Sequence, residues 1–419
     1  MHKQPKVIIV GAGFGGMQAA QSLSRSGAEV VVIDRNNYNT FVPLLYQVAA
    51  AQIEPEIIAY PIRTILRRAN NTRFLMAEVK RIDFTRQVVE INSTVLSYDY
   101  LVLATGSQTQ FMGVPGAADY GFSLRTLAQA VALRNHILDC FEQASRVPDP
   151  VRRQQLLTFV IVGGGPTGVE VAGTLVELKQ SLQRDYPGLD WKSMQIILVQ
   201  SGRNLLVNLP ERLGNYTTRK LRQLGVKVHF QTRVSRVTQN AAEFQDGSLL
   251  PAGTVVWAAG LEATIPQVFA EPETVHKKKL KVRSTLQLMD YANVYAIGDL
   301  AHAEQHGKPL TGVAPEALQQ GVAVAQNIRR QLRGKVPKPF SYFNKGRLAI
   351  IGRYSGVGKI GPFLLTGFLP WLMWLSVHLV YLPGFRNRLL VLLSWLHAYG
   401  WGDRAVRQIL FTPSPAMQQ

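Results

Sequence analysis

Short runs of consecutive apolar residues alternate with segments of helical composition along most of the chain. A continuous apolar run such as 7–10 (VIIV) is typical of a parallel strand that is buried on both faces. Helical composition follows several of these runs, for example at 17–26 and 315–332. The alternation predicts an α/β protein built on parallel sheets. The predicted strands are 7–10, 29–33, 100–103, 158–162, 195–199, 254–257 and 294–297.

A glycine-rich turn follows the first predicted strand, where Gly11, Gly13 and Gly16 form the pattern GxGxxG. These glycines allow a tight turn, a close approach of the backbone to a diphosphate, and close packing of the helix on the strand. The N-terminus of the following helix supplies N–H groups for the phosphates. The second strand ends in Asp34, where a carboxylate accepts hydrogen bonds from an adenosine ribose. Together these features predict a dinucleotide site.

The same arrangement of strand, glycines and helix occurs a second time, at Gly163, Gly165 and Gly168. A chain with two such sites is expected to bind one flavin dinucleotide and one exchangeable nicotinamide dinucleotide. The strand after the second turn ends in Gln200 instead of an acid. A neutral side chain does not repel the 2′-phosphate of NADP, and Arg203 attracts it, so we expect NADH or NADPH as cosubstrate. The alternative is that Gln200 only hydrogen-bonds the ribose of NAD.

Three further strands end in small residues, which leave room for a nucleotide. The dipeptide Gly298-Asp299 is expected to admit the diphosphate of the flavin and to accept hydrogen bonds from its ribityl chain. The residues predicted to bind FAD are Gly11, Gly13, Gly16, Asp34, Thr105, Gly106, Gly298 and Asp299. Those predicted to bind NADH or NADPH are Gly163, Gly165, Gly168, Gln200, Arg203 and Gly260.

Composition restricts the class of protein further. The single cysteine, Cys140, excludes an intrachain disulfide, a CxxC zinc site and a flavoenzyme that passes electrons through a cysteine pair, and we expect no metal site. The formal net charge of +19 favours anionic partners. The N-terminus leads directly into the first predicted strand, so no signal peptide is expected.

The C-terminal part of the chain contains an apolar run at 363–382, 20 residues without a formal charge apart from His378. Its length is sufficient for a membrane span, but Pro370 interrupts it, and a second, amphipathic helix is expected after it. The segment 329–359 carries nine Lys and Arg residues and no acid. We therefore expect peripheral, monotopic attachment to an anionic membrane surface. The alternatives are a homodimer interface and a buried helix pair. Six aromatic residues are expected at the headgroup layer: Trp371, Trp374, Tyr381, Trp395, Tyr399 and Trp401.

In their order, the segments GAGFGG, LVLATG, IVGGGPTGVE, VVWAAG and YAIGD resemble flavoproteins with two dinucleotide-binding domains. The segments 41–50 (FVPLLYQVAA) and 166–170 (PTGVE) and the hydrophobic C-terminus look like those of type II NAD(P)H dehydrogenases. Members of that family are FAD-containing, membrane-bound NAD(P)H:quinone oxidoreductases that pump no ions. The resemblance implies an FAD-binding domain at 1–115 and 281–345, an NAD(P)H-binding domain at 116–280, and amphipathic membrane-anchoring helices within 346–419.

The resemblance also implies a site for a lipid quinone. Glu170 occupies the position of a glutamate that is proposed in the family to link the nucleotide, the quinone and proton transfer. The alternative is a carboxylate near a helix N-terminus, stabilised by the helix dipole. Gln319 matches the second glutamine of an AQxxxQ pattern, whereas Pro315 replaces the first, with Glu316 as a possible substitute. Gln47 and His378 complete the predicted quinone residues, and an interfacial histidine without a catalytic role is the alternative for His378.

The leading functional hypothesis is therefore a peripheral enzyme on the cytoplasmic face of a membrane that transfers electrons from NADH or NADPH through FAD to a lipid quinone. A soluble reductase that donates to a protein acceptor is a second hypothesis, which the apolar C-terminus disfavours. A basic flavoprotein with mainly a binding role is the third. No compact basic recognition helix is evident in the sequence, so we expect no nucleic-acid partner.

Overall fold

The computed structural model describes residues 4–92, 94–269, 274–275 and 278–409. The chain divides into two compact units. Unit 1 comprises Met1–Thr40, Tyr60–Gln108 and Leu261–Asn344, and unit 2 comprises Phe41–Ala59, Thr109–Gly260 and Lys345–Gln419. Both contain a parallel sheet with helices, so the predicted α/β fold is confirmed. The assignment of nucleotides to domains at the predicted boundaries stays a prediction.

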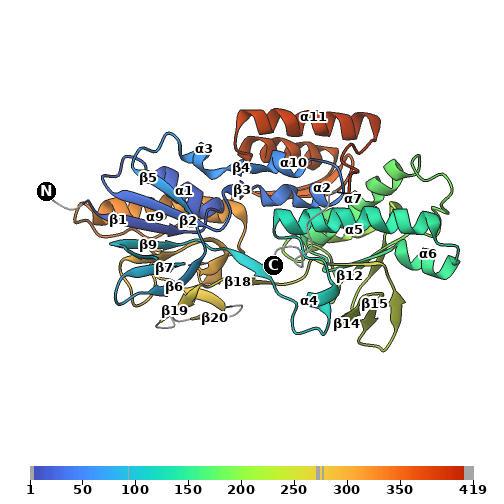
Figure 1. Cartoon of the computed structure of the whole chain (residues 1–419), viewed down its shortest axis with the longest axis horizontal. Coiled ribbons are helices and arrows are strands. Elements are labelled where there is room, and N and C mark those ends of the chain that lie inside the picture. The colour runs from blue at the N-terminus through green and yellow to red at the C-terminus, as the bar shows by residue number, and fades with distance from the viewer. Residues whose placement is uncertain (1–3, 93, 270–273, 276–277, 410–419) are drawn as a thin grey trace. The chain divides into compact units, whose positions relative to one another are not determined.

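Unit 1 is built on a five-stranded parallel sheet with the strand order β22-β9-β1-β2-β5 (Figure 1). Helices α1 and α9 pack against each other beside this sheet. A second, four-stranded sheet has the order β19-β6-β7-β8. The elements of these layers are β1 (Lys6–Val10), α1 (Phe14–Ser22), β2 (Glu29–Asp34), α3 (Ile62–Leu66), β5 (Thr72–Met76), β6 (Val79–Asp83), β7 (Val88–Ile91), β8 (Thr94–Ser97), β9 (Tyr100–Leu103), β19 (Gln267–Val268), β22 (Val294–Ala296) and α9 (Ala314–Gln331).

Successive side chains of β1 point to opposite faces of the sheet, and both faces are buried. Val7 and Ile9 belong to the apolar cluster that includes residues of α1 and α9. Ile8 and Val10 point to the opposite face and join a cluster with residues of β6 and β7. Because successive side chains of a strand alternate between faces, a continuous apolar run is required here, as the sequence predicted.

Shorter elements complete unit 1 and the junctions between the units. In small sheets, β21 pairs with β20 on one side and β23 on the other, β24 pairs with β25, β10 with β18, and β3 with β4. The bounds are β3 (Tyr38–Thr40), β4 (Ala59–Pro61), β10 (Ser107–Thr109), β18 (Leu261–Ala263), β20 (Thr274–Val275), β21 (Lys279–Lys281), η4 (Gly298–Leu300), β23 (Ala301–His302), β24 (Glu304–Gln305) and β25 (Lys308–Pro309).

Unit 2 contains a four-stranded parallel sheet with the order β13-β12-β11-β17 and two antiparallel sheets, β14-β15-β16 and β26-β27-β28. Its first part consists of η1 (Val42–Leu44), α2 (Leu45–Ala49), η2 (Pro55–Ile58), α4 (Ala117–Tyr120), α5 (Leu127–Arg146), α6 (Pro150–Leu156), β11 (Thr158–Val162), α7 (Pro166–Leu182), β12 (Gln195–Val199) and α8 (Glu211–Gln223). Its remaining elements are β13 (Lys227–His229), β14 (Val234–Thr238), β15 (Ala241–Phe244), β16 (Leu249–Pro251), β17 (Thr254–Trp257), β26 (Arg347–Gly352), β27 (Ser355–Ile360), β28 (Phe363–Gly367), α10 (Phe368–Tyr381) and α11 (Phe385–Trp401).

Helix α7 packs closely on strand β26, and a glycine makes this possible. A Cβ atom built on Gly173 would lie 1.7 Å from the backbone oxygen of Ile351. Any larger residue would therefore push the helix off the strand. This contact places the side chains on the same stretch of α7 next to the backbone of β26.

The apolar run 363–382 is divided between a strand and a helix, which differs from the single interrupted helix that the sequence predicted. Its first five residues form β28, which pairs with β27. Gly367 has φ +86°, a conformation that favours glycine, and it separates the strand from α10. Pro370 lies in the first turn of α10, where a missing N–H breaks no helical hydrogen bond, so it does not interrupt the helix.

Helices α10 and α11 pack against each other, and both are drawn in red in Figure 1. Among the residues that the structure describes, no helix combines the length and the apolar character needed to cross a membrane.

Candidate functional site

The first glycine turn, in unit 1, has the geometry that a diphosphate requires. Gly11 has φ +101°, and a Cβ atom on it would lie 2.4 Å from the backbone oxygen of Ala104. A Cβ atom on Gly16 would lie 1.9 Å from the oxygen of Gly11, so the helix and the turn meet backbone to backbone. A Cβ atom built on Gly13, at the N-terminus of α1, would meet no atom of another segment within 4 Å. The turn is therefore closed on the protein side and open where a phosphate would approach.

Asp34 fixes the shape of this turn. Its Oδ2 accepts a hydrogen bond of 2.7 Å from the N–H of Ala12, and its Oδ1 accepts one of 2.8 Å from the N–H of Asn36. Buried Asn39 donates to the carbonyl of Ala12 from the other side, at 2.6 Å. Sequence reasoning missed Asn39, because no motif marks an asparagine at that distance from the glycines.

The predicted residues Thr105, Gly106, Gly298 and Asp299 also lie in unit 1. The Thr105 hydroxyl donates to the carbonyl of Thr264, and Ser107 Oγ donates to Asp299 Oδ2 at 2.5 Å. Gly298 has φ +72°, and its N–H donates to Oε1 of buried Gln320 at 2.6 Å. Gln320 therefore holds the Gly-Asp turn from α9. The glutamine pattern in the sequence indicates only its neighbour, Gln319.

The second glycine turn, in unit 2, repeats the first almost contact for contact. A Cβ atom on Gly168 would lie 1.9 Å from the oxygen of Gly163, which has φ +110°, and the space above Gly165 is open. Gln200 Oε1 accepts a hydrogen bond of 2.9 Å from the N–H of Gly164, as Asp34 does from Ala12. Gln200 is therefore part of the turn itself.

Two other predicted nucleotide residues of unit 2 differ in their surroundings. The side chain of Arg203 is exposed, as a residue that attracts a phosphate must be. Gly260 has φ +74°, and a Cβ atom on it would lie 2.8 Å from the carbonyl oxygen of Gln110. A glycine is therefore required at 260 for the close approach of these two segments.

Glu170 lies on α7, five residues into the helix and beyond its first turn. It is half-buried, and hydrogen bonds from the N–H of Ile350 in β26 and from the indole of Trp374 in α10 reach its carboxyl group. Burial raises the pKa of this carboxyl to about 8. The two hydrogen bonds favour the charged form and lower the pKa, but burial has the larger effect. The partners of Glu170 are thus a strand and a C-terminal helix, and the helix dipole is not its main support.

His378 lies one turn after Trp374 on α10. The two rings stack with their centroids 3.7 Å apart and an interplanar angle of 20°. His378 Nδ1 lies 2.7 Å from the carbonyl oxygen of Trp374, and since a carbonyl only accepts, Nδ1 carries the proton and Nε2 the lone pair. Burial lowers the pKa of His378 to about 4. The ring is therefore neutral at physiological pH and is an acceptor, not an acid.

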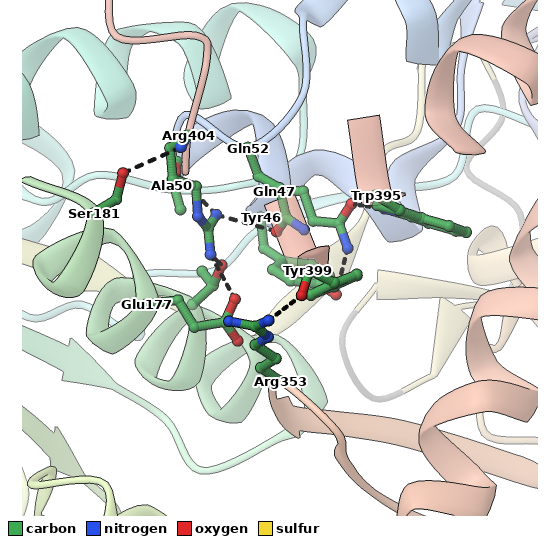
Figure 2. A network of polar contacts seen from close by, with 11 residues as sticks. Tyr46, Gln47, Ala50, Gln52, Glu177, Ser181, Arg353, Trp395, Tyr399 and Arg404 are labelled. Carbon is green, nitrogen blue, oxygen red and sulfur yellow. Dashed lines mark hydrogen bonds and ion pairs between the residues drawn. The ribbon is translucent and has the colours of Figure 1, made fainter. Parts of the chain in front are cut away.

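Gln47, on α2, is completely buried and bridges two aromatic residues. Its Oε1 accepts a hydrogen bond of 2.7 Å from the indole N–H of Trp395, and its Nε2 donates to the hydroxyl of Tyr46 at 3.0 Å (Figure 2). Burial raises the pKa of Tyr46 well above its ordinary value, and the nearby charge of Glu170 adds to this effect. Both ends of the Gln47 amide are thus engaged within the protein.

Arg404 follows α11 and attaches the end of the chain to the same region (Figure 2). Its guanidinium, 2% exposed, donates to the carbonyl of Ala50, to Gln52 Oε1, to Thr174 Oγ1 and to Glu177 Oε2. Arg353 and the hydroxyl of Tyr354 both donate to the carbonyl of Tyr399, at the end of α11. Sequence reasoning found none of these contacts, since isolated arginines in connecting segments carry no motif.

The residues of the glutamine pattern lie in unit 1. Pro315 is in the first turn of α9, where proline is favourable. The Gln319 side chain exchanges two hydrogen bonds of 2.9 Å with the backbone of Phe343. Buried Glu316 accepts hydrogen bonds from the N–H groups of Gly312 and Val313, so it caps α9 and does not substitute for the missing glutamine.

The helix pair α10–α11 exposes an apolar surface. Its most exposed large apolar side chains are Phe368, Leu369, Val380, Phe385, Leu393, Leu396 and Trp401. Of the six aromatic residues expected at the headgroup layer, Tyr381 and Trp401 are exposed, whereas Trp371, Trp374, Trp395 and Tyr399 are buried within unit 2. That expectation was wrong for these four, because a helix that is apolar on all sides does not reveal which side packs on the protein.

Comparisons with known proteins agree with this geometry. The family model of the pyridine nucleotide-disulphide oxidoreductases matches residues 5–321. A type II NADH:quinone oxidoreductase of Mycobacterium tuberculosis is 37% identical, over 94% of this chain and 88% of that protein. One of Staphylococcus aureus is 30% identical, over 85% of this chain and 89% of that protein. The fold is also that of NDH2 from Plasmodium falciparum, solved in complex with NADH, with a TM-score of 0.89, 21% identity and coverage of 98% of this chain and 100% of that chain.

Proposed function

Since the chain belongs to the pyridine nucleotide-disulphide oxidoreductases and, among them, to the type II NADH:quinone oxidoreductases, we propose that it transfers two electrons from NADH through FAD to a lipid quinone without pumping ions. The observation that carries this proposal is the presence, in one chain, of two intact glycine turns and of a half-buried carboxyl group with a raised pKa beside a C-terminal apolar helix pair.

The first turn suits FAD, because its glycines are closed toward the protein and open at the helix N-terminus. The residues that would hold FAD are Gly11, Gly13, Gly16, Asp34, Thr105, Gly106, Gly298 and Asp299. When bound, FAD accepts a hydride from the nicotinamide and passes its two electrons to the quinone. Asn39 and Gln320 support this site by fixing the two turns.

The second turn is proposed to hold the diphosphate of NADH, with Gly163, Gly165, Gly168 and Gly260 lining the nucleotide. Gln200 stabilises the turn through the N–H of Gly164, and it carries no charge that would exclude a 2′-phosphate. Exposed Arg203 adds a positive charge near this position. We therefore include NADPH as an alternative cosubstrate.

Quinone reduction also requires protons. A hydride supplies two electrons and one proton, whereas a quinol contains two added protons, so one proton per turnover comes from solution. Glu170 suits the role of the donor, because a carboxyl with a pKa of about 8 is protonated at neutral pH and can release its proton to a quinone oxygen. His378, which is neutral, offers Nε2 as an acceptor to a quinol hydroxyl.

The remaining predicted quinone residues take different roles in the proposal. Gln47 orients Tyr46 and Trp395 and acts from behind the site, because its own amide is engaged. Gln319 and Pro315, at the start of α9 in unit 1, stay predicted quinone residues, and the Gln319 amide is itself engaged by the backbone of Phe343.

The exposed apolar surface of α10 and α11 is proposed to attach the enzyme peripherally to an anionic membrane. Arg386 and Arg388 are exposed beside Phe385, and Lys345 lies 3.2 Å from the hydroxyl of Tyr381, so cations accompany this surface. Apolar side chains enter the acyl boundary, while each cation near anionic lipid adds about 1 kcal/mol.

Anaerobic stopped-flow absorbance tests the proposal. NADH should bleach the flavin of the purified protein. A short-chain quinone should then restore the flavin absorbance within the time of one catalytic turnover. A protein that is reduced by NADH but is reoxidised by ferredoxin and not by quinone would support the soluble reductase instead. A colourless protein that FAD does not reconstitute would contradict both.

A further inference from the structure

Trp374 is buried although its neighbours on α10 are exposed. Its side chain is 1% exposed, whereas Leu372 and Val377 are 44% and 40% exposed. An indole carries one N–H donor, and in an apolar helix that donor must find a partner on the protein. The partner is the carboxyl group of Glu170 on α7. The helix pair thus reaches the proposed proton donor through a single hydrogen bond.

The same ring also contacts the other candidate groups of this region. One face stacks on His378 at 3.7 Å, and the ring meets Tyr46 edge-on with the centroids 6.1 Å apart. The carbonyl of Trp374 accepts the Nδ1 proton of His378. Trp374 also contacts Trp395, with the ring centroids 6.3 Å apart, so its neighbours lie on α2, α7, α10 and α11, and two of them are the groups that the proposed function uses.

We propose that Trp374 is a positioning residue for quinone reduction, which holds the Glu170 carboxyl through its indole N–H and the His378 ring through its stacked face. The proposal rests on the proposed function. It extends that function by linking the proton donor directly to the helix pair that carries the exposed apolar surface.

Other titratable groups in this region do not replace Glu170. Tyr46 of α2 stays neutral, because burial raises its pKa further above neutrality. His378 of α10 is neutral as well. Burial also raises the pKa of Glu177, two turns further along α7, but the charge of Arg404, 2.7 Å away, opposes this shift. Tyr399 of α11 is a buried phenol whose pKa burial raises further above neutrality. A titration of the quinone reaction near pH 8 is therefore assigned to Glu170.

A role in packing alone is the competing explanation, and Trp374→Phe separates the two, since phenylalanine keeps an aromatic ring and removes the N–H. Trp395→Phe is the matched control: it also removes a buried indole N–H from the helix pair, but that N–H bonds Gln47. In the holoenzyme, a hydrogen bond to the carboxylate stabilises the charged form. Its loss should raise the pKa of Glu170. The alkaline limb of the pH profile of the quinone-dependent rate should therefore move to higher pH by about one unit. Trp395→Phe should leave this limb in place.

The rate of flavin reduction by NADH is measured in the same variants and should match wild type. Equal alkaline limbs in wild type and Trp374→Phe, or equal shifts in both variants, would overturn the proposal. A wild-type enzyme that does not reduce quinone would instead contradict the proposed function.

A spectroscopic measurement keeps the test independent of turnover and of the folding of Trp374→Phe. With indole-¹⁵N tryptophan, the six indole N–H signals are assigned by substituting the other five tryptophans one at a time. The Trp374 signal should move with pH with a midpoint near 8 in the wild-type holoenzyme and stay constant in Glu170→Gln. A Trp374 signal that does not titrate in wild type would contradict the hydrogen bond.

Discussion

Arg404 and Glu177 form a buried ion pair with 2.7 Å between Nη2 and Oε2, which joins the segment after α11 to helix α7 (Figure 2). The guanidinium also donates to residues of α7 and of the segment after α2. The helix pair is therefore attached to the protein at its far end as well as through Trp374.

Arg404→Met should lower the stability of the protein strongly. Removing one partner of a buried ion pair costs about 3–5 kcal/mol, because Glu177 is left buried without its charge partner. The melting temperature, measured by near-UV circular dichroism of the holoenzyme, should fall by more than about 5 °C. Arg407→Met is the control: its pairs with Asp185 and Asp403 are partly exposed, so a change of at most about 1 kcal/mol is expected. Equal losses in the two variants would show that burial of Arg404 does not matter.

Glu170→Gln should slow the reoxidation of the flavin by quinone by at least about tenfold and leave its reduction by NADH within about twofold of wild type. The amide keeps the shape of the side chain but has no proton to release. Stopped-flow measurements of both half-reactions provide the comparison. Glu211→Gln, at an exposed position at the start of α8, serves as the control. Unchanged half-reactions in Glu170→Gln would place the proton route elsewhere.

Gln200→Glu should lower kcat/KM for NADPH much more than for NADH. A glutamate retains an oxygen for the N–H of Gly164, so the turn is preserved, and only the new charge repels the 2′-phosphate. Steady-state kinetics with both nucleotides measure the ratio. An equal loss for NADH and NADPH would mean that Gln200 acts only on the turn. Arg203→Gln should weaken NADPH selectively as well.

Leu393→Glu combined with Leu396→Glu should release the protein from anionic vesicles while flavin content and NADH oxidation by small artificial acceptors remain. Both side chains are more than half exposed, so the folded protein tolerates the charges. Co-sedimentation with vesicles measures binding, and Val207→Glu, an exposed apolar residue outside the helix pair, is the control. A double variant that still sediments, or one that changes only the oligomeric state, would favour a homodimer surface. Truncating the chain before α10 is a poorer test, because it also removes Trp374, Trp395 and Arg404 from the interior of unit 2.

The stability of the protein should depend on pH through Glu170. Its pKa is raised from 4.5 to about 8 by folding, so the native state binds more protons than the unfolded chain between these values. Stability is therefore full at low pH and falls as the pH rises from 4.5 to 8. Glu170→Gln should reduce this decline in the melting temperature. His378→Gln should act in the opposite window, since a pKa lowered from 6.5 to about 4 makes the native state lose stability as the pH falls.

The sequence by itself determined the parts of this protein whose signals are contiguous. Each glycine turn, with its strand, its helix and the residue that ends the next strand, is encoded within a few dozen residues, and the structure places Asp34 and Gln200 in equivalent hydrogen bonds to the two turns. The resemblance to the family was carried by the same local segments. Local backbone requirements, such as the positive φ of Gly11 and Gly163, select glycine wherever the chain repeats this turn.

The tertiary structure alone decided which residues meet and which are buried. Trp374 and Trp401 are the same residue type on neighbouring helices of similar composition, yet one is 1% and the other 73% exposed. Glu170 acquires its raised pKa from desolvation against β26 and α10, segments that lie about 200 residues away in sequence. Gln320 and Arg404 likewise depend on hydrogen-bond partners that no sequence motif indicates. Burial and long-range hydrogen bonding depend on packing between distant segments, and periodicity reports only the pattern within one segment.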